Sequence, residues 1–526
     1  MVGEQRWTVE LKTYKKKDVV VVGGGTAGVV AALAAARTGA DTILIEKTNL
    51  LGGMMTGALV NTPNQFRSRT AGHPLVVRGI PLEIFQRVLK AGGTHPGDGE
   101  GPVADDHGHV TDPIIVAHVL DEMMEEAGVE VLFETTAFDV LLAGKTVQGV
   151  AVANKSGAQV VLGDVIVDAT GDADIAAAAG VEFVVGRKED SKTHGGSMLM
   201  IIGGVDLRRY IEYLKSDENL SPEERKQLDE ERVLYFGPGR GPHFPWEVRE
   251  EMYRSPQPVR TWEDVERDLQ EGNLGKGLHR RLPRSYRLEK EWLQYIKLGK
   301  VPPLLESPRR IYPRPYFYWA GIFKHGQMRY EYLLTGVYEY WFNPTDAAEL
   351  NRAIMFMRKL NWTYLQFLRE RIPGFENAYI VMEAPTIGLR ESRRIVGEYV
   401  LTAEDCLNAR KFPDVIGKLG CSYKIQKPFD VPYRILVPRN VENLLVAGRC
   451  VSVEDRVFGH GEFLFRDQGC CMVTGHAAGT AAALASRTGT TPRNLDVRML
   501  QRRLLEQGAF LFDEEEEDRR KEVFGA

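Results

Sequence analysis

The stretch DVVVVGGGTAGVVAALAAARTGADTILIE, residues 18–46, decides the fold. It opens with a valine run, which is typical of a strand buried on both faces of a parallel sheet. A glycine-rich turn and a helix of small residues, 29–40, follow, and a second apolar strand runs from 42 to 45. This order predicts a βαβ unit and therefore an α/β fold built on a parallel sheet.

The glycine turn has the spacing of a site for a dinucleotide diphosphate. Gly23 permits the sharp turn, Gly25 lets the backbone approach a diphosphate, and Gly28 lets the helix pack closely on the strand. Helix-start amides then face the phosphates. Glu46, 18 residues after Gly28, is placed to bind a ribose diol and would repel a 2′-phosphate, which disfavours NADP. The expected contacts of this Rossmann-like unit are Gly23, Gly25, Thr26, Ala27, Gly28 and Glu46.

The same pattern of an apolar strand followed by a glycine turn recurs later in the chain. DVIVDATG, residues 164–171, and NLLVAGR, residues 443–449, each predict a buried strand that enters a glycine turn, and 473–485 predicts another helix of small residues. Short strand-like runs after residue 128 predict a small antiparallel meander. We therefore expect a dinucleotide-binding domain in two parts, residues 15–190 and 433–490, with an inserted α+β substrate or cap domain at 191–432 and a helical, acidic tail at 491–526.

Two further helices are expected between these motifs. One spans residues 112–127 and is ended by Gly128, and the other spans 345–371 and is capped by Asp346. The acidic run from Glu514 to Glu517 is expected to be a solvated tail.

After Glu46 the chain continues with Lys47 and then LGGMMT, residues 51–56. Here the sequence resembles the glutathione-reductase-like flavoproteins and, within them, the FAD-dependent oxidoreductases related to the flavin subunit of heterodisulfide reductase. The segments at 169–172, 387–398, 443–449 and 475–482 resemble further motifs of these proteins. The resemblance implies FAD, with the helix at 475 pointing its N-terminus at the flavin pyrimidine. The cofactor contacts that it adds are Lys47, Gly52, Gly53, Met54, Thr56, Ala137, Ala169, Thr170, Gly171, Asp172, Gly448, Arg449, Gly475, Ala477 and Ala478.

The resemblance implies redox chemistry at flavin N5, usually hydride transfer between the flavin and a small organic substrate. The chain departs from the heterodisulfide-reductase pattern, because its five cysteines form no CxxC pair and no cluster for iron–sulfur centres. No metal site is expected. The adjacent Cys470 and Cys471 are expected to be small buried residues rather than a strained vicinal disulfide.

Oxidation of a substrate needs a base, because a proton leaves together with the hydride. His460 is the first choice, since it lies with Glu462 in a glycine-flanked loop before the final helix. Arg390 and Arg466 are candidates for binding an anionic substrate, because a guanidinium can hold a planar carboxylate through two hydrogen bonds. The catalytic candidates are therefore His460, Arg390, Glu462 and Arg466.

Other segments are weaker candidates. Arg393 and Arg394 could bind an anion or lie on a solvated helix face, and the sequence does not separate the two. The aromatic run at 312–319 is expected to be a strand rather than a wall of the substrate pocket. The polar run at 97–109 is expected to be a flexible loop rather than a metal site. His194 is expected to be an ordinary loop histidine.

Composition limits the function classes. The 526 residues include 67 Lys and Arg against 72 Asp and Glu, a net charge of −5, which gives no support for nucleic-acid binding. No apolar run predicts a membrane span, and the polar start of the chain predicts a cytoplasmic protein. We expect an enzyme acting on a small molecule. An electron-transfer subunit of a larger complex, a protein with structural FAD and an NAD dehydrogenase stay open as alternatives, as does homo-oligomerisation.

Overall fold

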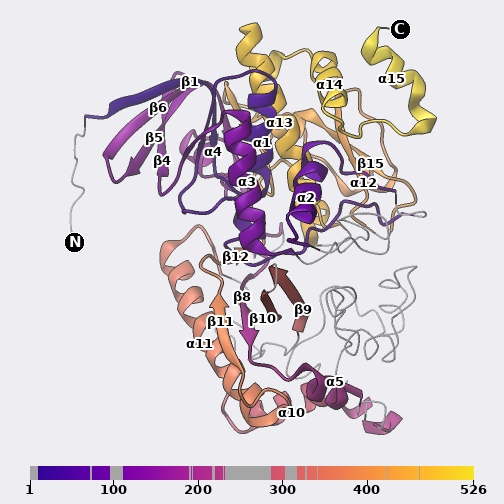
Figure 1. Cartoon of the computed structure of the whole chain (residues 1–526). Coiled ribbons are helices and arrows are strands. Elements are labelled where there is room, and N and C mark those ends of the chain that lie inside the picture. Colours follow the sequence, from indigo (N-terminus) through magenta and orange to yellow (C-terminus); the bar gives the residue numbers. More distant parts are fainter. Residues whose placement is uncertain are drawn as a thin grey trace.

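The computed structural model describes residues 10–70, 74–94, 111–188, 191, 193–215, 220–224, 226–228, 230, 286–302, 317–325, 328–339, 342–422, 424–460 and 463–525. In Figure 1 the described elements form two bodies, one above the other. The upper body contains the two ends of the chain, and the lower body is built from its middle section.

The upper body is built on a parallel sheet with strand order β3-β2-β1-β6-β16. These strands are β1 (Lys12–Val22), β2 (Thr42–Ile45), β3 (Glu130–Leu132), β6 (Gly157–Asp168) and β16 (Leu444–Val446). Side chains of the central strands are fully buried, which is why they read as continuous apolar runs. The predicted α/β fold with a parallel sheet is confirmed, and its last strand comes from the far end of the chain.

Strand β6 pairs with different strands along its two halves. Its first half pairs antiparallel with β5 (Thr146–Asn154), which pairs in turn with β4 (Thr136–Ala143). Its second half pairs in parallel with β16, with Ile166 opposite Leu444. The expected antiparallel meander is therefore an extension of the dinucleotide sheet, visible at the left of Figure 1.

Small-residue helices pack on the parallel sheet. They are α1 (Thr26–Arg37) and α13 (Gln468–Thr488), with α2 (Ile80–Lys90) and α3 (Pro113–Ala127) beside them. Helix α3 begins and ends as predicted, because Asp112 accepts hydrogen bonds from two first-turn amides and Gly128 adopts a left-handed conformation. Helix α13 begins five residues before the expected start at Val473.

The lower body is an antiparallel sheet covered by helices, with strand order β11-β8-β10-β9 and β12 paired with β8. The strands are β8 (Gly196–Gly203), β9 (Phe317–His325), β10 (Met328–Glu339), β11 (Tyr379–Glu383) and β12 (Gly388–Leu389). The helices are α5 (Leu207–Lys215), α10 (Tyr286–Lys297) and α11 (Ala347–Arg371). The long helix predicted at 345–371 is thus present, and Asp346 caps it.

Further short elements flank the middle section of the chain on both sides. They are α4 (Asp174–Ala178), β7 (Phe183–Val185), β13 (Arg393–Ile395), α12 (Ala403–Leu407), β14 (Val415–Leu419) and β15 (Phe429–Pro432). Buried side chains from Leu401 to Val431 pack in the same hydrophobic core as α1 and α13. We therefore propose that the inserted unit ends near residue 390 rather than at 432.

The C-terminal segment is packed on this core. It contains α14 (Val497–Glu506) and α15 (Glu517–Phe524). Glu516 is 8% exposed and forms ion pairs with Lys418, which is fully buried, and with Arg519. The expectation of a solvated acidic tail is therefore wrong for Glu516, because the buried Lys418 is held between two carboxylates, those of Asp430 and Glu516.

All five cysteines are buried and free, so the adjacent pair Cys470 and Cys471 forms no disulfide. Within the described ranges, no helix combines the length and the apolar character needed to cross a bilayer.

Candidate functional site

Three glycine turns meet at one edge of the parallel sheet. Gly23 follows β1, Gly171 follows β6 and Gly448 follows β16, and all three have positive φ angles, of 99°, 80° and 91°. Neighbouring parallel strands present their carboxyl ends at the same edge, which is where such sheets bind ligands. A Cβ on Gly23 would lie 2.5 Å from the carbonyl oxygen of Ala169, so the first two turns are in direct contact.

The glycines of the first turn differ in what they are for. A Cβ on Gly28 would lie 1.7 Å from the carbonyl oxygen of Gly23, so Gly28 allows the close approach of α1. Gly25 has an ordinary φ of −76°, and a Cβ there would meet no atom within 4 Å. Among the glycines whose surroundings the structure describes, Gly25 alone has neither a conformational nor a packing reason to be glycine.

Glu46 lies over this turn. Its Oε2 accepts a hydrogen bond from the Gly24 amide at 2.6 Å, and its Oε1 accepts from the amide and the hydroxyl of Thr48, both at 2.8 Å. The carboxylate is 7% exposed and is held beside the start of α1. Strand β4, which contains Ala137, begins close to Glu46, because the Thr135 amide donates a hydrogen bond to the Glu46 carbonyl at 3.0 Å.

A second glycine pair supports the first turn from the side. Gly52 and Gly53 have φ angles of 97° and 53°, and a Cβ on Gly53 would lie 2.8 Å from the Cα of Gly25. The Thr56 hydroxyl closes the loop by donating to the Leu51 carbonyl at 2.6 Å. The Met54 carbonyl accepts from the Val60 amide at 2.9 Å, which directs the following chain away from the turn.

An ion pair joins the other two turns. Arg449 Nη2 donates to Asp172 Oδ1 at 2.6 Å, and the Ser392 hydroxyl donates to the same oxygen at 2.6 Å. Burial opposes ionisation of Asp172, but Arg449 and Ser392 outweigh it, so its pKa lies below the usual value. Lys47 also lowers the pKa of Asp172, which places Lys47 at this edge. The Nε of Arg449 is buried and has no hydrogen-bond partner among the described residues.

Asp168 orders the turn at 169–172 from below. Its Oδ1 accepts from the Thr170 amide and hydroxyl at 3.0 and 2.7 Å, and its Oδ2 accepts from the Ala176 amide at 2.8 Å. Complete burial raises the pKa of Asp168 to about 6. The side chain of Thr170 is thus engaged by Asp168, a residue that the sequence interpretation did not single out.

Helices α1 and α13 run in the same direction and nearly touch. Cβ atoms on Gly475 and Gly479 would lie 2.2 and 1.9 Å from the carbonyl oxygens of Ala27 and Ala31. The placement of Gly475 at the helix start was wrong, because α13 begins at Gln468. Gly475, Ala477 and Ala478 lie inside the helix and are buried. The helix start lies seven residues, or about 10 Å, beyond the level of Ala27.

The predicted catalytic arginines, Arg390 and Arg466, both lie at the junction between the two bodies. Arg390 Nη1 donates to the Gly195 carbonyl at 3.2 Å, and the next residue back, His194, contacts the Gly459 carbonyl through Nε2 at 2.8 Å. A Cβ on Gly459 would lie 2.1 Å from Arg466 Nη1, and the φ of Gly459 is 153°. His194 and Arg466 therefore contact the turn that precedes His460, and Arg390 holds the Gly195 carbonyl next to His194.

A buried ion pair forms the wall of this junction. Glu391 is fully buried, and it accepts from Arg394 Nη1 and, through Oε2, from the His194 amide at 2.7 Å. Arg394 stacks over the Phe458 ring, with its Cζ 4.9 Å from the centroid. Arg393 donates to Asp174 Oδ1 at 2.9 Å. The solvated helix face is wrong for Arg393 and Arg394, because both lie on strand β13 and Arg394 is buried.

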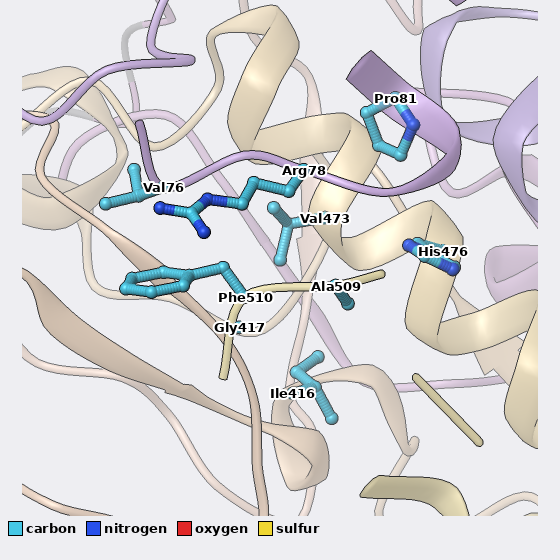
Figure 2. A pocket seen from close by; sticks show the side chains of 9 residues that line it. All are labelled: Val76, Arg78, Pro81, Ile416, Gly417, Val473, His476, Ala509 and Phe510. Atoms are coloured by element: carbon cyan, nitrogen blue, oxygen red, sulfur yellow. The ribbon is translucent and has the colours of Figure 1, made fainter. Parts of the chain in front are cut away.

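A separate small hollow, partly open to solvent, lies on another face of α13. Figure 2 shows Val473 and His476 of α13 facing Arg78 and Phe510 across it. Burial lowers the pKa of His476 to about 4, and its Nε2 contacts Gln507 Oε1 at 2.9 Å, so this histidine is neutral and structurally held. None of the three glycine turns lines this hollow.

Residues 18–504 match the profile of a protein family described as FAD dependent oxidoreductase. The chain belongs to this family. FAD is therefore its cofactor, and the protein is an oxidoreductase. Comparison with curated proteins found no match.

Similar solved structures include a geranylgeranyl bacteriochlorophyll reductase-like protein from Thermoplasma acidophilum, at 13% identity and a TM-score of 0.39, covering 94% of this chain and 84% of that one. THI4 from Thermovibrio ammonificans is 24% identical with a TM-score of 0.25, covering 33% of this chain and 67% of that one. The myxobacterial chondrochloren halogenase CndH is 14% identical with a TM-score of 0.36, covering 97% and 80%.

The glycine-turn edge of this FAD dependent oxidoreductase fits its cofactor. The space beside Gly25 admits a diphosphate at the start of α1, which has no side-chain cap and no acidic residue in its first turn. The unpartnered Nε of Arg449 is a buried cationic donor at the same edge. Glu46 lies over the same turn, and the start of α13 lies about 10 Å further along.

Some expected site residues cannot be placed. Glu462 and the polar run at 97–109 lie outside the described residues, as do Tyr312 and Tyr316 of the aromatic run. His460 closes the π-helical turn Arg456–His460, and its side chain is not described. In the part of the chain that the structure describes, no group of three His, Cys, Asp or Glu side chains could hold a metal. His194, which the sequence predicts to be an ordinary loop histidine, lies at this junction and contacts the Gly459 carbonyl.

Proposed function

We propose that this flavoenzyme transfers hydride between a small organic anion and flavin N5. The observation that carries the proposal is the junction at which His194 and Arg466 contact the turn at Gly459 while Arg390 holds the Gly195 carbonyl next to His194. The two arginines come from opposite sides of the boundary between the two hydrophobic cores. Enclosed sites between domains are where small-molecule ligands usually bind.

The glycine-turn edge would hold the cofactor. The proposed contacts are Gly23, Gly25, Thr26, Ala27, Gly28, Glu46, Lys47, Gly52, Gly53, Met54, Thr56, Ala137, Ala169, Gly171, Asp172, Gly448 and Arg449. Arg449 would neutralise phosphate charge while Asp172 fixes its orientation, and Glu46 would bind the adenosine ribose. These roles agree with the resemblance to glutathione-reductase-like proteins and to the flavin subunit of heterodisulfide reductase.

The substrate would be held by charge at the junction. Guanidinium groups bind planar carboxylates through paired hydrogen bonds. Arg466 is bonded to the turn that contains Gly459, and Arg390 is bonded to Gly195, next to His194. The Glu391–Arg394 pair keeps the wall behind them rigid, because each buried charge has its partner. The substrate class that this arrangement favours is a small carboxylate.

Bound FAD supplies the acceptor or donor of the hydride, and the chain supplies orientation and proton transfer. His460 follows Gly459 directly, and its imidazole is suited to take the proton that leaves the substrate. His194 would position this turn, because its Nε2–H donates to the Gly459 carbonyl.

Anaerobic reduction of the bound flavin tests the proposal. A panel of small carboxylates and their neutral methyl esters would be added to the purified full-length protein, and loss of the flavin absorption band followed. We expect a carboxylate to bleach the band and its ester to fail. Bleaching by the ester alone, or by no member while dithionite still reduces the flavin, would contradict the proposal.

We expect Arg390→Gln to weaken substrate binding by about tenfold or more while FAD stays bound. This is the scale of a lost charged hydrogen bond. Arg209→Gln is the matched control, because Arg209 is an exposed arginine paired with Glu376 in the lower body. Equal affinities for the two variants would remove Arg390 from the site.

A further inference from the structure

Helix α11 presents two large apolar side chains to solvent, because Met355 is 68% exposed and Trp362 is 58% exposed. The opposite face already packs the helix on the core of the lower body, through buried side chains such as Phe356 and Leu360. The two exposed residues are seven positions apart, which is two helical turns, so they lie in line about 10 Å apart. Figure 1 shows α11 along the outer side of the lower body.

Cations flank this apolar line on both sides. Arg352 and Lys359 are exposed along one edge of it, and Arg358 is exposed along the other, since residues three and four positions apart are neighbours on a helix. The helix has no acidic residue from Leu350 to Arg369, although the whole chain has a net charge of −5. No described residue forms an ion pair with Arg358 or Lys359. The α11 outer face comprises Arg352, Met355, Arg358, Lys359 and Trp362.

The turn after α10 continues the same chemistry. Lys300 Nζ donates to Glu370 Oε2 at 2.6 Å and so joins this turn to the end of α11. Leu298 of the turn is exposed and lies between Lys297 and Lys300, which are also exposed. The pattern of an exposed apolar side chain between cations therefore recurs where the α11 outer face ends.

This pattern fits a surface of anionic lipid better than another protein. A second copy of the face would bring cations against cations, and like charges repel. A helical partner needs apolar anchors three or four positions apart, but Arg358 and Lys359 occupy the positions between Met355 and Trp362. At a membrane surface, apolar and aromatic side chains enter the boundary between headgroups and acyl chains, while Arg and Lys reach the lipid phosphates.

We propose that the α11 outer face docks this protein on a membrane surface that contains anionic phospholipid. The helix lies in the plane of the headgroups, with Met355 and Trp362 inserted below the phosphates and the cations beside them. This docking concerns where the enzyme is held, and it does not depend on the proposed hydride transfer.

Co-sedimentation of the purified full-length protein with vesicles tests this inference. One set of vesicles contains phosphatidylglycerol and phosphatidylcholine in equal parts, and the other contains phosphatidylcholine alone. We expect binding to the anionic vesicles that is weakened by added salt, and binding to the neutral vesicles that is at least about tenfold weaker. Equal binding to both sets, or no binding to the anionic set, would overturn the inference.

Substitutions separate the α11 outer face from other surfaces. Arg358→Gln and Lys359→Gln should each weaken binding to anionic vesicles by roughly fivefold, the effect of one cation near a charged membrane. Met355→Gln should also weaken it. The matched controls are Lys155→Gln, at an exposed lysine of the upper body, and Ile114→Gln, because Ile114 of α3 is 69% exposed. Equal effects of the variants and their controls would contradict docking through α11.

Quenching of tryptophan fluorescence by brominated phosphatidylglycerol locates the contact. Most of the quenched emission should come from Trp362, so quenching should be lost in Trp362→Phe, which keeps an aromatic side chain and vesicle binding. Quenching that persists in this variant would place the membrane contact elsewhere and overturn the inference. Binding to polyglutamate instead of anionic vesicles would assign the face to an acidic protein and would overturn it too. None of these outcomes changes the flavin-reduction test of the proposed function.

Discussion

A Cβ atom on Gly479 of α13 would lie 1.9 Å from the carbonyl oxygen of Ala31 in α1. The same contact one turn earlier joins Gly475 to Ala27. The two helices are therefore locked in register, and the register sets how far the start of α13 projects beyond the glycine turn. Tight helix packing in this protein is thus a condition for the geometry of its cofactor site.

Gly479→Val should destabilise the fold, because the valine side chain would have to fit between the backbones of α13 and α1. Overpacking costs about 1–3 kcal/mol and more where a backbone must move. Thermal unfolding measures the effect. Thr488→Ala, at the exposed end of the same helix, should change the unfolding temperature very little, and an equal loss in both variants would argue against close packing as the cause.

Glu516→Gln should reduce stability at neutral pH by about 3 kcal/mol, because it leaves Lys418 buried with one partner fewer. Burial opposes ionisation of Glu516, but its bonds to Lys418 and Lys411 outweigh it, so its folded pKa lies below the ordinary 4.5. Its stabilising contribution is therefore complete above pH 4.5 and is lost as the pH falls toward the folded pKa.

Denaturant unfolding between pH 7 and 3 checks both statements. Wild-type stability should fall more steeply below pH 4.5 than that of Glu516→Gln. Glu515→Gln is the matched control, because Glu515 and its partner Lys427 are both exposed and their pair should contribute little. A variant curve parallel to the wild-type curve would show that Glu516 does not titrate with folding.

His194→Ala should keep FAD bound but lower kcat by roughly tenfold to a hundredfold, because a misplaced catalytic group loses rate without losing cofactor. His194→Gln should recover part of this loss, since a glutamine amide can also donate to the Gly459 carbonyl. Steady-state kinetics on the substrate found by flavin reduction would separate kcat from KM. A loss confined to KM would place His194 in substrate binding instead.

His460→Ala should lower turnover by roughly a hundredfold or more, the usual effect of removing an acid–base group. The flavin spectrum of the variant should match that of the wild type. The pH profile of kcat/KM should also lose the ionisation that a histidine base gives. Turnover close to normal would exclude His460 as the base.

The parts of the fold foreseen from the sequence are those fixed by local patterns. The valine run, the glycine turn and Glu46 are consecutive, and each has a local physical reason. The start of α13 was misplaced because Gln468 to Met472 have no apolar periodicity, and their helix is held by Gln65 and Asn64, some 400 residues away. Two charge partners of Glu516, Lys411 and Lys418, lie roughly a hundred residues earlier in the chain, so its run of acids looked like a tail.

The residues of the candidate site also differ in whether the sequence predicts them. The glycine turns could be predicted because each consists of a short motif of neighbouring residues. His194 could not, because its role depends on a contact with Gly459, which belongs to the other end of the chain. A histidine followed by two glycines was the only local signal, and it does not separate a positioning residue from an ordinary loop.

The central claim is that FAD lies against Gly25, and the FAD affinity of Gly25→Ala tests it most directly. The new methyl group meets no atom of the protein, so apoprotein stability should be unchanged or rise by up to about 1 kcal/mol. FAD affinity, measured on the same apoprotein by flavin fluorescence, should fall by about tenfold or more, because the methyl group occupies the approach of the diphosphate. A Gly25→Ala protein that binds FAD as tightly as the wild type would contradict the account.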